Sequence, residues 1–340
     1  MTIQVPNRVS LAITPTPLQY LERTSAALGV EFYIKRDDMT GLELSGNKVR
    51  KLEFLFADAI NKGANVVITG GGEQSNHCRA TAMAAAKLGL ASVVCLRTAD
   101  KTKPPKTSGN IFLDRLAGAE IIWIDHDDWA HQEEVYEREA ARQRELGNVP
   151  YIIPEGGSNA IGAWGYIECC RELAEQLGEL NSAQNSVKTS VVYACGSGGT
   201  GAGLVMGAKM YDFDRHQAQI TGFNVCDDAE FFVQRIHRIC EEVVAASPSC
   251  PVVERSSIDM IDGYVGRGYA QSSPAELECL RDMARRDAIL FDPVYTGKAF
   301  FGLVSELSQN PGKFGERVVF IHTGGVFGLF PQADEFAGLL

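Results

Sequence analysis

The sequence lacks the features that mark several specialised protein classes. Its nine cysteines are scattered and contain no Cys-x-x-Cys pair, so the pattern indicates neither a zinc site nor a redox motif. No segment approaches the roughly 20 apolar residues that a membrane-spanning helix needs, and residues 1–18 lack the apolar run of a signal peptide. The net charge of −11 argues against nucleic acid or an anionic membrane as partner. We therefore expect a cytoplasmic protein with mostly buried, reduced cysteines, no resident metal and a small-molecule substrate.

The composition is that of an α/β enzyme. The chain has 340 residues, of which 45% are hydrophobic and 22% charged, and its 34 glycines allow many tight loops. It contains no internal repeat, low-complexity tract or long linker. This length accommodates about two domains.

Apolar segments typical of buried strands alternate with helical patterns along the chain. Strands are predicted at 32–36, 66–69, 92–97, 120–124, 150–153, 190–195, 219–225 and 318–322. Helices are predicted at 18–28, 47–62, 80–88, 107–117, 131–147, 161–177, 199–210, 229–246, 274–286 and after Gly297. Residues 178–188 are polar and are predicted to form a surface linker. The alternation predicts two α/β domains, each an open, twisted, mostly parallel sheet flanked by helices. We expect a smaller domain at 48–162, a larger domain made of 1–47 and 163–340, and an active site between them.

One lysine stands at the start of a predicted helix. Lys48 ends a Gly-Asn-Lys motif and lies near the positive end of the helix dipole, beside Arg50 and Lys51, where an ammonium is disfavoured. The helix is indicated by apolar residues at helical spacing, namely Leu52, Leu55, Phe56 and Ile60. Such a lysine can form a Schiff base with an aldehyde cofactor or can be an ordinary solvated side chain. Taken alone, the second interpretation is the commoner one.

A glycine-rich loop joins the strand at 190–195 to a helix. It contains the residues Ser197, Gly198, Gly199, Thr200 and Gly201. Such a loop turns backbone N–H groups toward an anion, and the helix dipole favours negative charge, so the pattern predicts a phosphate site. It lacks the Lys-Ser/Thr ending of a nucleotide-binding loop. The alternative is a tight turn without a ligand.

Further polar residues stand at other predicted strand ends. Ser75, Asn76 and His77 follow the strand at 66–69 and open a helix, where Ser75 can bind a ligand or simply cap the helix. Tyr295 lies between a Pro turn and a helix start, where it can pack or act in proton transfer. Thr323 ends the last strand with a hydroxyl able to bond a neutral ring nitrogen.

Taken together, these motifs resemble one enzyme family. The chain is similar to pyridoxal-phosphate (PLP) enzymes of the tryptophan synthase β fold type, in the branch of D-cysteine desulfhydrase and 1-aminocyclopropane-1-carboxylate (ACC) deaminase. The resemblance covers nearly the whole chain and rests on ordered motifs at residues 14–18, 35–38, 46–48, 74–77, 156–159, 292–298 and 322–325.

The resemblance implies a role for each motif. Lys48 would be the PLP Schiff-base lysine, while Lys51 and the glycine-rich loop would hold the phosphate. Asn76 would sit beside the ring oxygen. Ser75, Tyr295 and Tyr269 would match the active-site serine and tyrosines of the family, with Tyr269 preferred over Tyr264 on spacing alone. Residues predicted to contact substrate are Asn47, Ser75, Asn76, His77 and Tyr295. A homodimer is also implied.

Two threonines indicate the reaction. Where ACC deaminase carries Glu and Leu, this sequence has Thr296 and Thr323, as the desulfhydrases do. Neutral hydroxyls near the ring nitrogen leave a weaker electron sink, which suits β-elimination better than ring opening. The expected reaction converts D-cysteine to pyruvate, ammonia and hydrogen sulfide. The alternatives are ACC deaminase, L-cysteate sulfo-lyase, an amino-acid racemase on the same fold, or a catalytically silent PLP-binding protein.

Glu73 departs from the desulfhydrase pattern, which has a small or apolar residue there. If its carboxylate faces the pocket, it would repel an anionic β-substituent and favour an amine-bearing substrate, or act as a base. If it faces away, it is a solvated loop residue. The sequence leaves both possibilities open.

Overall fold

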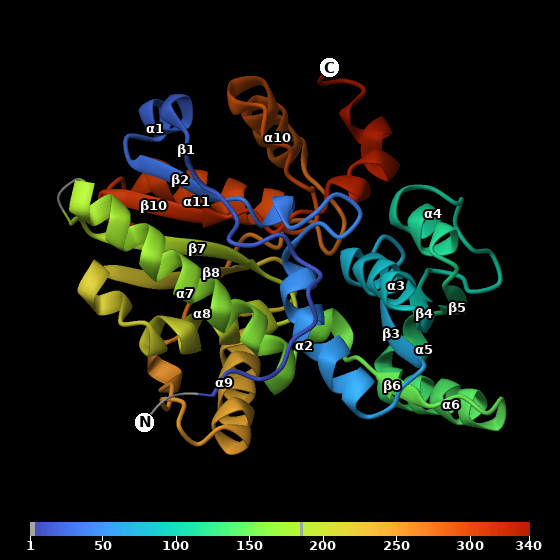
Figure 1. Cartoon of the computed structure of the whole chain (residues 1–340). Coiled ribbons are helices and arrows are strands. Elements are labelled where there is room, and N and C mark those ends of the chain that lie inside the picture. The colour runs from blue at the N-terminus through green and yellow to red at the C-terminus, as the bar shows by residue number, and fades with distance from the viewer. Residues whose placement is uncertain (1–3, 184–185) are drawn as a thin grey trace.

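The protein contains two β-sheets, each covered by helices (Figure 1). The computed structural model describes residues 4–183 and 186–340. The larger sheet has the strand order β1-β2-β10-β7-β8-β9, and only β1 runs antiparallel to its neighbour. Its strands are β1 (Leu18–Tyr20), β2 (Glu31–Lys35), β7 (Thr189–Cys195), β8 (Ala218–Asn224), β9 (Asp259–Ile261) and β10 (Arg317–Ile321). The smaller sheet is parallel throughout, in the order β5-β4-β3-β6. Its strands are β3 (Val66–Gly72), β4 (Ala91–Arg97), β5 (Glu120–Ile124) and β6 (Pro150–Ile152). The predicted fold class is confirmed.

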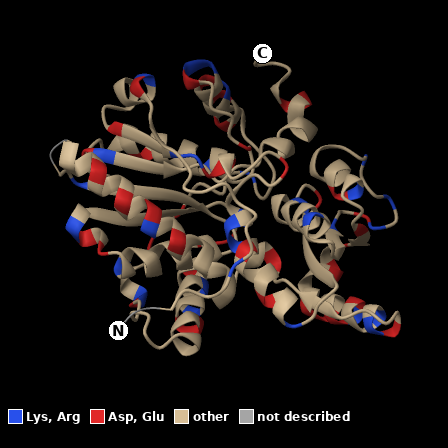
Figure 2. Ribbon diagram, in the orientation of Figure 1, with Lys and Arg blue, Asp and Glu red and all other residues tan. Residues whose placement is uncertain are grey.

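Helices connect the parallel strands. Those that pack on the larger sheet are α1 (Glu22–Leu28), α7 (Ala160–Ala183), α8 (Gly199–Met210), α9 (Ala229–Ala246), α10 (Pro274–Asp287) and α11 (Thr296–Gln309). Those around the smaller sheet are α2 (Asn47–Asn61), α3 (Asn76–Leu88), α4 (Gly109–Leu116), α5 (His126–Ala130) and α6 (Gln132–Glu145). Acidic and basic segments are interspersed along them (Figure 2).

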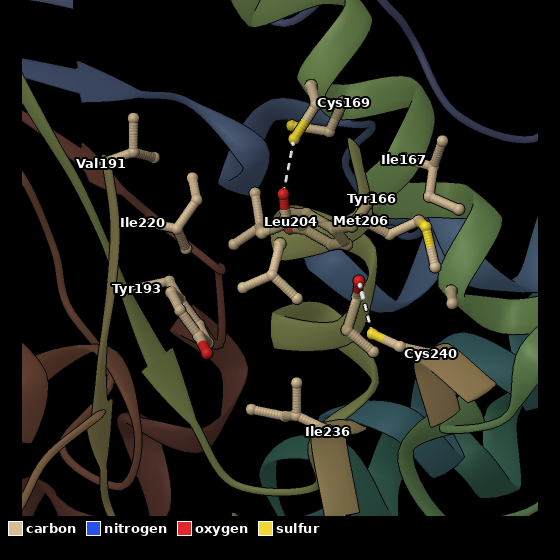
Figure 3. Packing of buried hydrophobic residues seen from close by; sticks show 14 of the residues in the cluster. Tyr166, Ile167, Cys169, Val191, Tyr193, Leu204, Met206, Ile220, Ile236 and Cys240 are labelled. Atoms are coloured by element: carbon tan, nitrogen blue, oxygen red, sulfur yellow. Dashed lines mark hydrogen bonds between the residues drawn. The ribbon is translucent and has the colours of Figure 1, made fainter. Parts of the chain in front are cut away.

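Both faces of the larger sheet are buried. Side chains alternate along a strand, so Val319 and Ile321 of β10 pack with α7, α8 and α9, while Val318 and Phe320 pack with α10 and α11. Figure 3 shows part of the first layer, in which Tyr193 of β7, Leu204 of α8 and Ile236 of α9 belong to one buried cluster. Burial on both faces explains the consecutive apolar residues of its central strands β7 and β10.

The smaller sheet is likewise covered on both sides. Val67 of β3 packs with Leu52 and Phe56 of α2, and its neighbours Val66 and Ile68 pack with α6. All strands of this sheet lie within residues 66–152. The exact domain limits remain a prediction.

Two local predictions are wrong. Residues 18–20 form β1, which pairs with β2, and the helix predicted at 18–28 begins only at Glu22. Residues 178–183 continue helix α7 where a linker was expected; residues 184–185 of that linker lie outside the described structure. The helix predicted from the apolar spacing at 47–62 is confirmed as α2, although Ile60 near its end is 42% exposed.

All nine cysteines are free thiols, and seven of them are buried, as the sequence predicts for most of them. Buried thiols such as Cys240 of α9 donate to backbone carbonyls, here that of Ala202 at 3.7 Å (Figure 3). Among the described residues, no helix has both the length and the apolar character needed to cross a membrane.

Candidate active site

A pocket lies where the carboxyl ends of strands from both sheets meet, next to the starts of α2, α3 and α8. Loops gather at this edge because parallel strands end there. The pocket brings together most of the predicted site residues, namely Asn47, Lys48, Ser75, Asn76, His77, Ser197, Gly198, Thr200, Tyr269, Tyr295 and Thr323. Lys51, Gly199 and Gly201 do not line it. Gly201 instead faces the Tyr193 hydroxyl, and a Cβ there would lie 2.3 Å from that oxygen.

Lys48 is the second residue of α2 and lines the pocket. The helix start is held against the end of β10, because the Asn47 N–H donates to the Thr323 carbonyl at 3.0 Å. Gly46, which precedes the helix, has φ 100° and is so close to that carbonyl that a Cβ would lie 2.8 Å from it. Burial lowers the pKa of Lys48, although the Glu155 carboxylate partly opposes this. Lys48 therefore yields a neutral amine more readily than an exposed lysine.

Arg50 does not contribute to this pKa, which corrects part of the sequence argument. Arg50 lies on the opposite side of α2, where its guanidinium bonds Asp37 at 2.8 Å and Glu172 at 2.9 Å. Lys35 bonds Glu172 at 3.0 Å. We call Lys35, Asp37, Arg50 and Glu172 the buried charge cluster. Although burial opposes it, the Arg50 guanidinium holds the pKa of Asp37 below its ordinary value. The cluster joins α2 to β2 and α7 and so fixes the helix that carries Lys48.

A second lysine supports an anion site at the glycine-rich loop. The Lys51 ammonium donates to the Gly156 carbonyl at 3.1 Å, and a Cβ on Gly199 would lie 3.0 Å from it. Burial, followed by the charge of Lys48, lowers the pKa of Lys51 well below its ordinary value. The Ser158 hydroxyl accepts from the Gly199 N–H at 3.2 Å and donates to Ser197 at 2.9 Å. A bound anion at the start of α8 would restore the charged form of Lys51, since opposite charge favours an ammonium.

Ser75 and Asn76 open α3 inside the pocket. The Ser75 hydroxyl accepts from the Cys78 N–H at 3.2 Å and is the N-cap of the helix. The Asn76 side-chain oxygen accepts from Asn110 at 2.9 Å, which fixes the orientation of its amide. The first N–H groups of α3 face this end of the helix without intrahelical partners. The site can therefore bind a carboxylate.

His77 lines the same pocket as a neutral side chain. Its Nε2 lies 2.9 Å from the Thr69 hydroxyl, which itself donates to the Ile153 carbonyl at 2.8 Å. Because that hydroxyl proton is committed, Nε2 must be the donor. Burial and then the charges of Lys48 and Lys51 lower the pKa of His77 well below its ordinary value. Its Nδ1 has no protein partner among the described residues.

Two tyrosines form a hydrogen-bonded pair in the pocket wall. The hydroxyls of Tyr269 and Tyr295 are 2.6 Å apart. Burial raises the pKa of Tyr269 to about 12 and that of Tyr295 further. Tyr264, the alternative to Tyr269 on sequence, instead donates to Glu306 at 2.8 Å. The pair can pass a proton from one phenol to the other.

Thr296 and Thr323 meet at the end of β10, with their hydroxyl oxygens 2.8 Å apart. The loop before Thr296 is fixed by Asp292, whose carboxylate accepts from the N–H groups of three following residues. The two hydroxyls provide a neutral hydrogen-bonding group where Thr323 lines the pocket.

Glu73 does not line the pocket. Its carboxylate accepts from the Thr98 hydroxyl at 2.5 Å, on the side of β4. The acidic group that does line the pocket is Glu155, which the sequence analysis missed. Burial raises the pKa of Glu155, opposed by the charges of Arg235, Lys48 and Arg97. Its position after strand β6, next to Gly156 and Gly157, is the sequence signal that could have identified it.

Comparison with known proteins agrees with the family that the sequence motifs resemble. A family model described as "Pyridoxal-phosphate dependent enzyme" matches residues 9–324. The chain is 40% identical over 337 residues to the "Bifunctional D-cysteine desulfhydrase/1-aminocyclopropane-1-carboxylate deaminase, mitochondrial" of Arabidopsis thaliana, covering 97% of this chain and 81% of that one. It is also 40% identical over 332 residues to the D-cysteine desulfhydrase of Yersinia enterocolitica, covering 95% of each chain.

A solved structure described as that of an ACC deaminase homologue superimposes with a TM-score of 0.87. That protein is 37% identical in sequence, and the match covers 98% of this chain and 97% of that one.

Proposed function

Because the chain belongs to the family of pyridoxal-phosphate dependent enzymes, we propose that it is a lyase that removes the β-substituent of a small amino acid. The favoured substrate is D-cysteine, which would give pyruvate, ammonia and hydrogen sulfide. The observation that carries this choice is the hydroxyl pair of Thr296 and Thr323 at 2.8 Å. The relatives named D-cysteine desulfhydrase support it.

The pocket residues fit the cofactor that the family uses. A glycine at 196 keeps the space open, since a Cβ there would lie 2.8 Å from the Tyr295 ring. Lys48 is the amine for covalent attachment, while Lys51 and the start of α8 suit the phosphate. Thr323 offers a hydroxyl for the ring nitrogen. When bound, PLP withdraws electrons from the substrate's Cα and so makes loss of its proton easier.

Lys48 is the proposed base at Cα. Lys48 would hold the cofactor and would serve as the base at Cα, and burial keeps the pKa of its amine below the ordinary value. The start of α3 binds the substrate carboxylate through its free N–H groups, with Ser75 and Asn76 fixing the approach. Ser75 needs no nucleophilic role, because its hydroxyl already caps the helix.

The tyrosine pair is the proposed proton source for the leaving sulfur. Tyr295 lines the pocket and its hydroxyl is bonded to that of Tyr269, so a proton given up by one phenol can be replaced from the other. Both phenols stay protonated at neutral pH, because burial raises their pKa values. A general acid in this place keeps the thiolate from leaving as a bare anion.

ACC deamination is the second candidate, because one relative is described as a bifunctional enzyme with this activity and one similar structure as that of an ACC deaminase homologue. The neutral threonine pair argues against it, because ring opening needs the stronger electron sink that a carboxylate at the ring nitrogen provides. L-Cysteate is disfavoured by Glu155, whose carboxylate would face an anionic β-substituent.

A substrate panel tests the proposal. The purified protein with PLP is incubated with D-cysteine, L-cysteine, β-chloro-D-alanine, L-cysteate and ACC, and pyruvate, 2-oxobutyrate and sulfide are measured. We expect pyruvate and sulfide from D-cysteine. Formation of 2-oxobutyrate from ACC alone would replace the proposal by the second candidate. Deuterium entering Cα without any oxo-acid would indicate a racemase.

Three further expectations belong to this proposal. We propose that the enzyme is cytoplasmic, that it is a homodimer, and that its cleft lies between a domain of residues 48–162 and a domain formed by the remaining residues. The family relationship supports the homodimer, and the two-sheet arrangement supports the two domains. The relative from Arabidopsis thaliana is described as mitochondrial, so location needs a test of its own by fractionation.

A further inference from the structure

A second cavity lies beside the active-site pocket. It has a volume of about 480 Å³, within the usual range for ligand sites. The two spaces share Glu155, Tyr269 and the backbone around Ser197 as a common wall. We call this cavity the vestibule. A group attached to the β-atom of a bound amino acid can extend from the pocket into it.

Arg97 at the end of β4 is held in the vestibule by two aromatic rings. Its guanidinium lies 4.7 Å from the centroid of Trp129 and 5.4 Å from that of Tyr269. Across the described chain, its side chain makes neither a hydrogen bond nor an ion pair with protein. The guanidinium carbon lies over both rings, a cation–π arrangement that uses none of the N–H groups of Arg97 as hydrogen-bond donors. A guanidinium with available N–H groups is suited to bind a carboxylate through two parallel hydrogen bonds.

Three other charged side chains line the vestibule, namely Glu155, Asp227 and Arg235. Arg235 donates through Nε to the Ser197 carbonyl at 3.0 Å, which leaves its terminal nitrogens for a ligand. Within the described residues, no salt bridge joins any of the four vestibule charges. Two guanidiniums and two carboxylates therefore border one cavity without pairing. Arg97, Glu155 and Arg235 are partly buried and Asp227 is exposed, so these charges remain available, and their arrangement is complementary to a ligand that carries both signs.

We propose that the vestibule binds the ammonium and carboxylate of a second amino-acid unit attached to the substrate sulfur. This inference rests on the proposed function and specifies its substrate class, which is a thioether joining two amino acids. Arg97 binds the distal carboxylate, the carboxylates of Glu155 and Asp227 bind the distal ammonium, and Trp129 contacts the methylene groups between them. Free cysteine fills only the inner pocket.

The reaction balances without any further reagent. Loss of the Cα proton is followed by cleavage of the Cβ–S bond, and the bonding electrons go to sulfur, which takes up a proton. One water is consumed as the three-carbon fragment becomes pyruvate and ammonia. The second amino acid leaves as a free thiol, so lanthionine, in which two alanine units share one sulfur, would yield cysteine.

The test compares thioethers that differ only in the distal group. The holoenzyme is assayed for initial rates of pyruvate formation with D-cysteine, S-propylcysteine, S-(2-carboxyethyl)cysteine, S-(2-aminoethyl)cysteine and lanthionine, each in both configurations. We expect kcat/KM for lanthionine to exceed that for S-propylcysteine by about 10- to 100-fold, the effect of a few charge-assisted hydrogen bonds. The singly charged analogues should fall between them.

Variants locate the effect. Arg97→Gln should lower the ratio of kcat/KM for lanthionine to that for cysteine by about tenfold or more, and Arg97→Lys should lower it less. Arg238→Gln, an exposed side chain of α9 paired with Glu242, is the matched control and should leave the ratio unchanged. The visible absorption of bound PLP in each variant confirms that the protein is folded.

The outcomes separate the two proposals. Turnover of cysteine with no preference for lanthionine over S-propylcysteine, or a preference that survives in Arg97→Gln, would overturn the vestibule proposal and leave the lyase. Turnover of lanthionine without cysteine would support the vestibule and remove cysteine as substrate. Pyruvate from none of the compounds would overturn both.

Discussion

The buried charge cluster and the vestibule hold charged side chains in opposite ways. In the cluster, Arg50 bonds both Asp37 and Glu172, and each of the three is less than 5% exposed. In the vestibule, the partly exposed Arg97 lies over two aromatic rings and has no protein acceptor within the described structure. In the cluster the charges are paired with one another inside the protein. In the vestibule they are available to a ligand.

The two arrangements have different roles, since the cluster stabilises the fold and the vestibule is available for binding. Charges that are paired and buried fix one geometry, here the position of α2 and its Lys48, but they cannot take part in binding. Unpaired charges at a cavity lower stability slightly or not at all, and they remain free to recognise a ligand. Substitutions in the buried charge cluster should therefore change stability, whereas substitutions of residues that line the pocket or the vestibule should change catalysis.

The largest expected effect is on folding. Arg50→Met removes the cation that pairs with two buried carboxylates, and we expect the free energy of unfolding to fall by about 3–5 kcal/mol. Denaturant unfolding measures it. Arg171→Met is the matched control, because Arg171 pairs with Glu168 and Glu175 on the exposed side of α7 and should change stability by less than about 1 kcal/mol. Equal effects of the two substitutions would remove the distinction between cluster and surface.

A substitution in the pocket wall should lower the rate of the reaction. Tyr295→Phe removes the phenol that lines the pocket, and we expect kcat for β-elimination to fall by about 10²-fold, as for loss of a general acid. β-Chloro-D-alanine, whose leaving group needs no proton, should be affected much less. Tyr264→Phe, outside the pocket, is the control. A similar loss with both substrates would show that the phenol is not the proton source.

The smallest effect concerns pH. The Glu155 carboxylate raises the pKa of Lys48 against the effect of burial, so Glu155→Gln should lower that pKa further. The neutral amine is then present at lower pH, and the pH at which the apoenzyme takes up PLP at half its maximal rate should move downward. Stopped-flow absorbance measures this rate. Glu73→Gln, whose carboxylate is turned to Thr98, should leave the profile in place. A shift in both variants, or in neither, would contradict the assignment.

Local patterns were sufficient to predict much of the fold and most of the pocket. Lys48 and Tyr295 each lie two residues from a glycine at the start of a helix, and such positions carry their signal in a few neighbouring residues. Alternating strand and helix patterns likewise predict parallel sheets. The failures at 18–20 and 178–183 occurred where short segments are decided by tertiary contacts, as in the pairing of β1 with β2.

The vestibule could not be predicted in this way. Arg97 and Arg235 are distant in sequence and lie on different elements, and nothing near either residue differs from an ordinary surface arginine. Glu73 attracted attention because the desulfhydrases have a small or apolar residue there, yet its carboxylate bonds Thr98 away from the pocket, and the acidic residue that lines the pocket is Glu155. Arg50 was interpreted as a neighbour of Lys48, although successive helix residues face different sides. The sequence was sufficient to identify the motifs, but it did not show in which direction the side chains point.

The central claim is that the amine of Lys48, and not the nearby amine of Lys51, binds the cofactor. The most direct measurement is reduction of the holoenzyme with borohydride, followed by proteolysis and mass spectrometry of the peptides. The account predicts the phosphopyridoxyl group on Lys48 alone and its absence from Lys48→Ala. The group on Lys51, or on no lysine of α2, would contradict it.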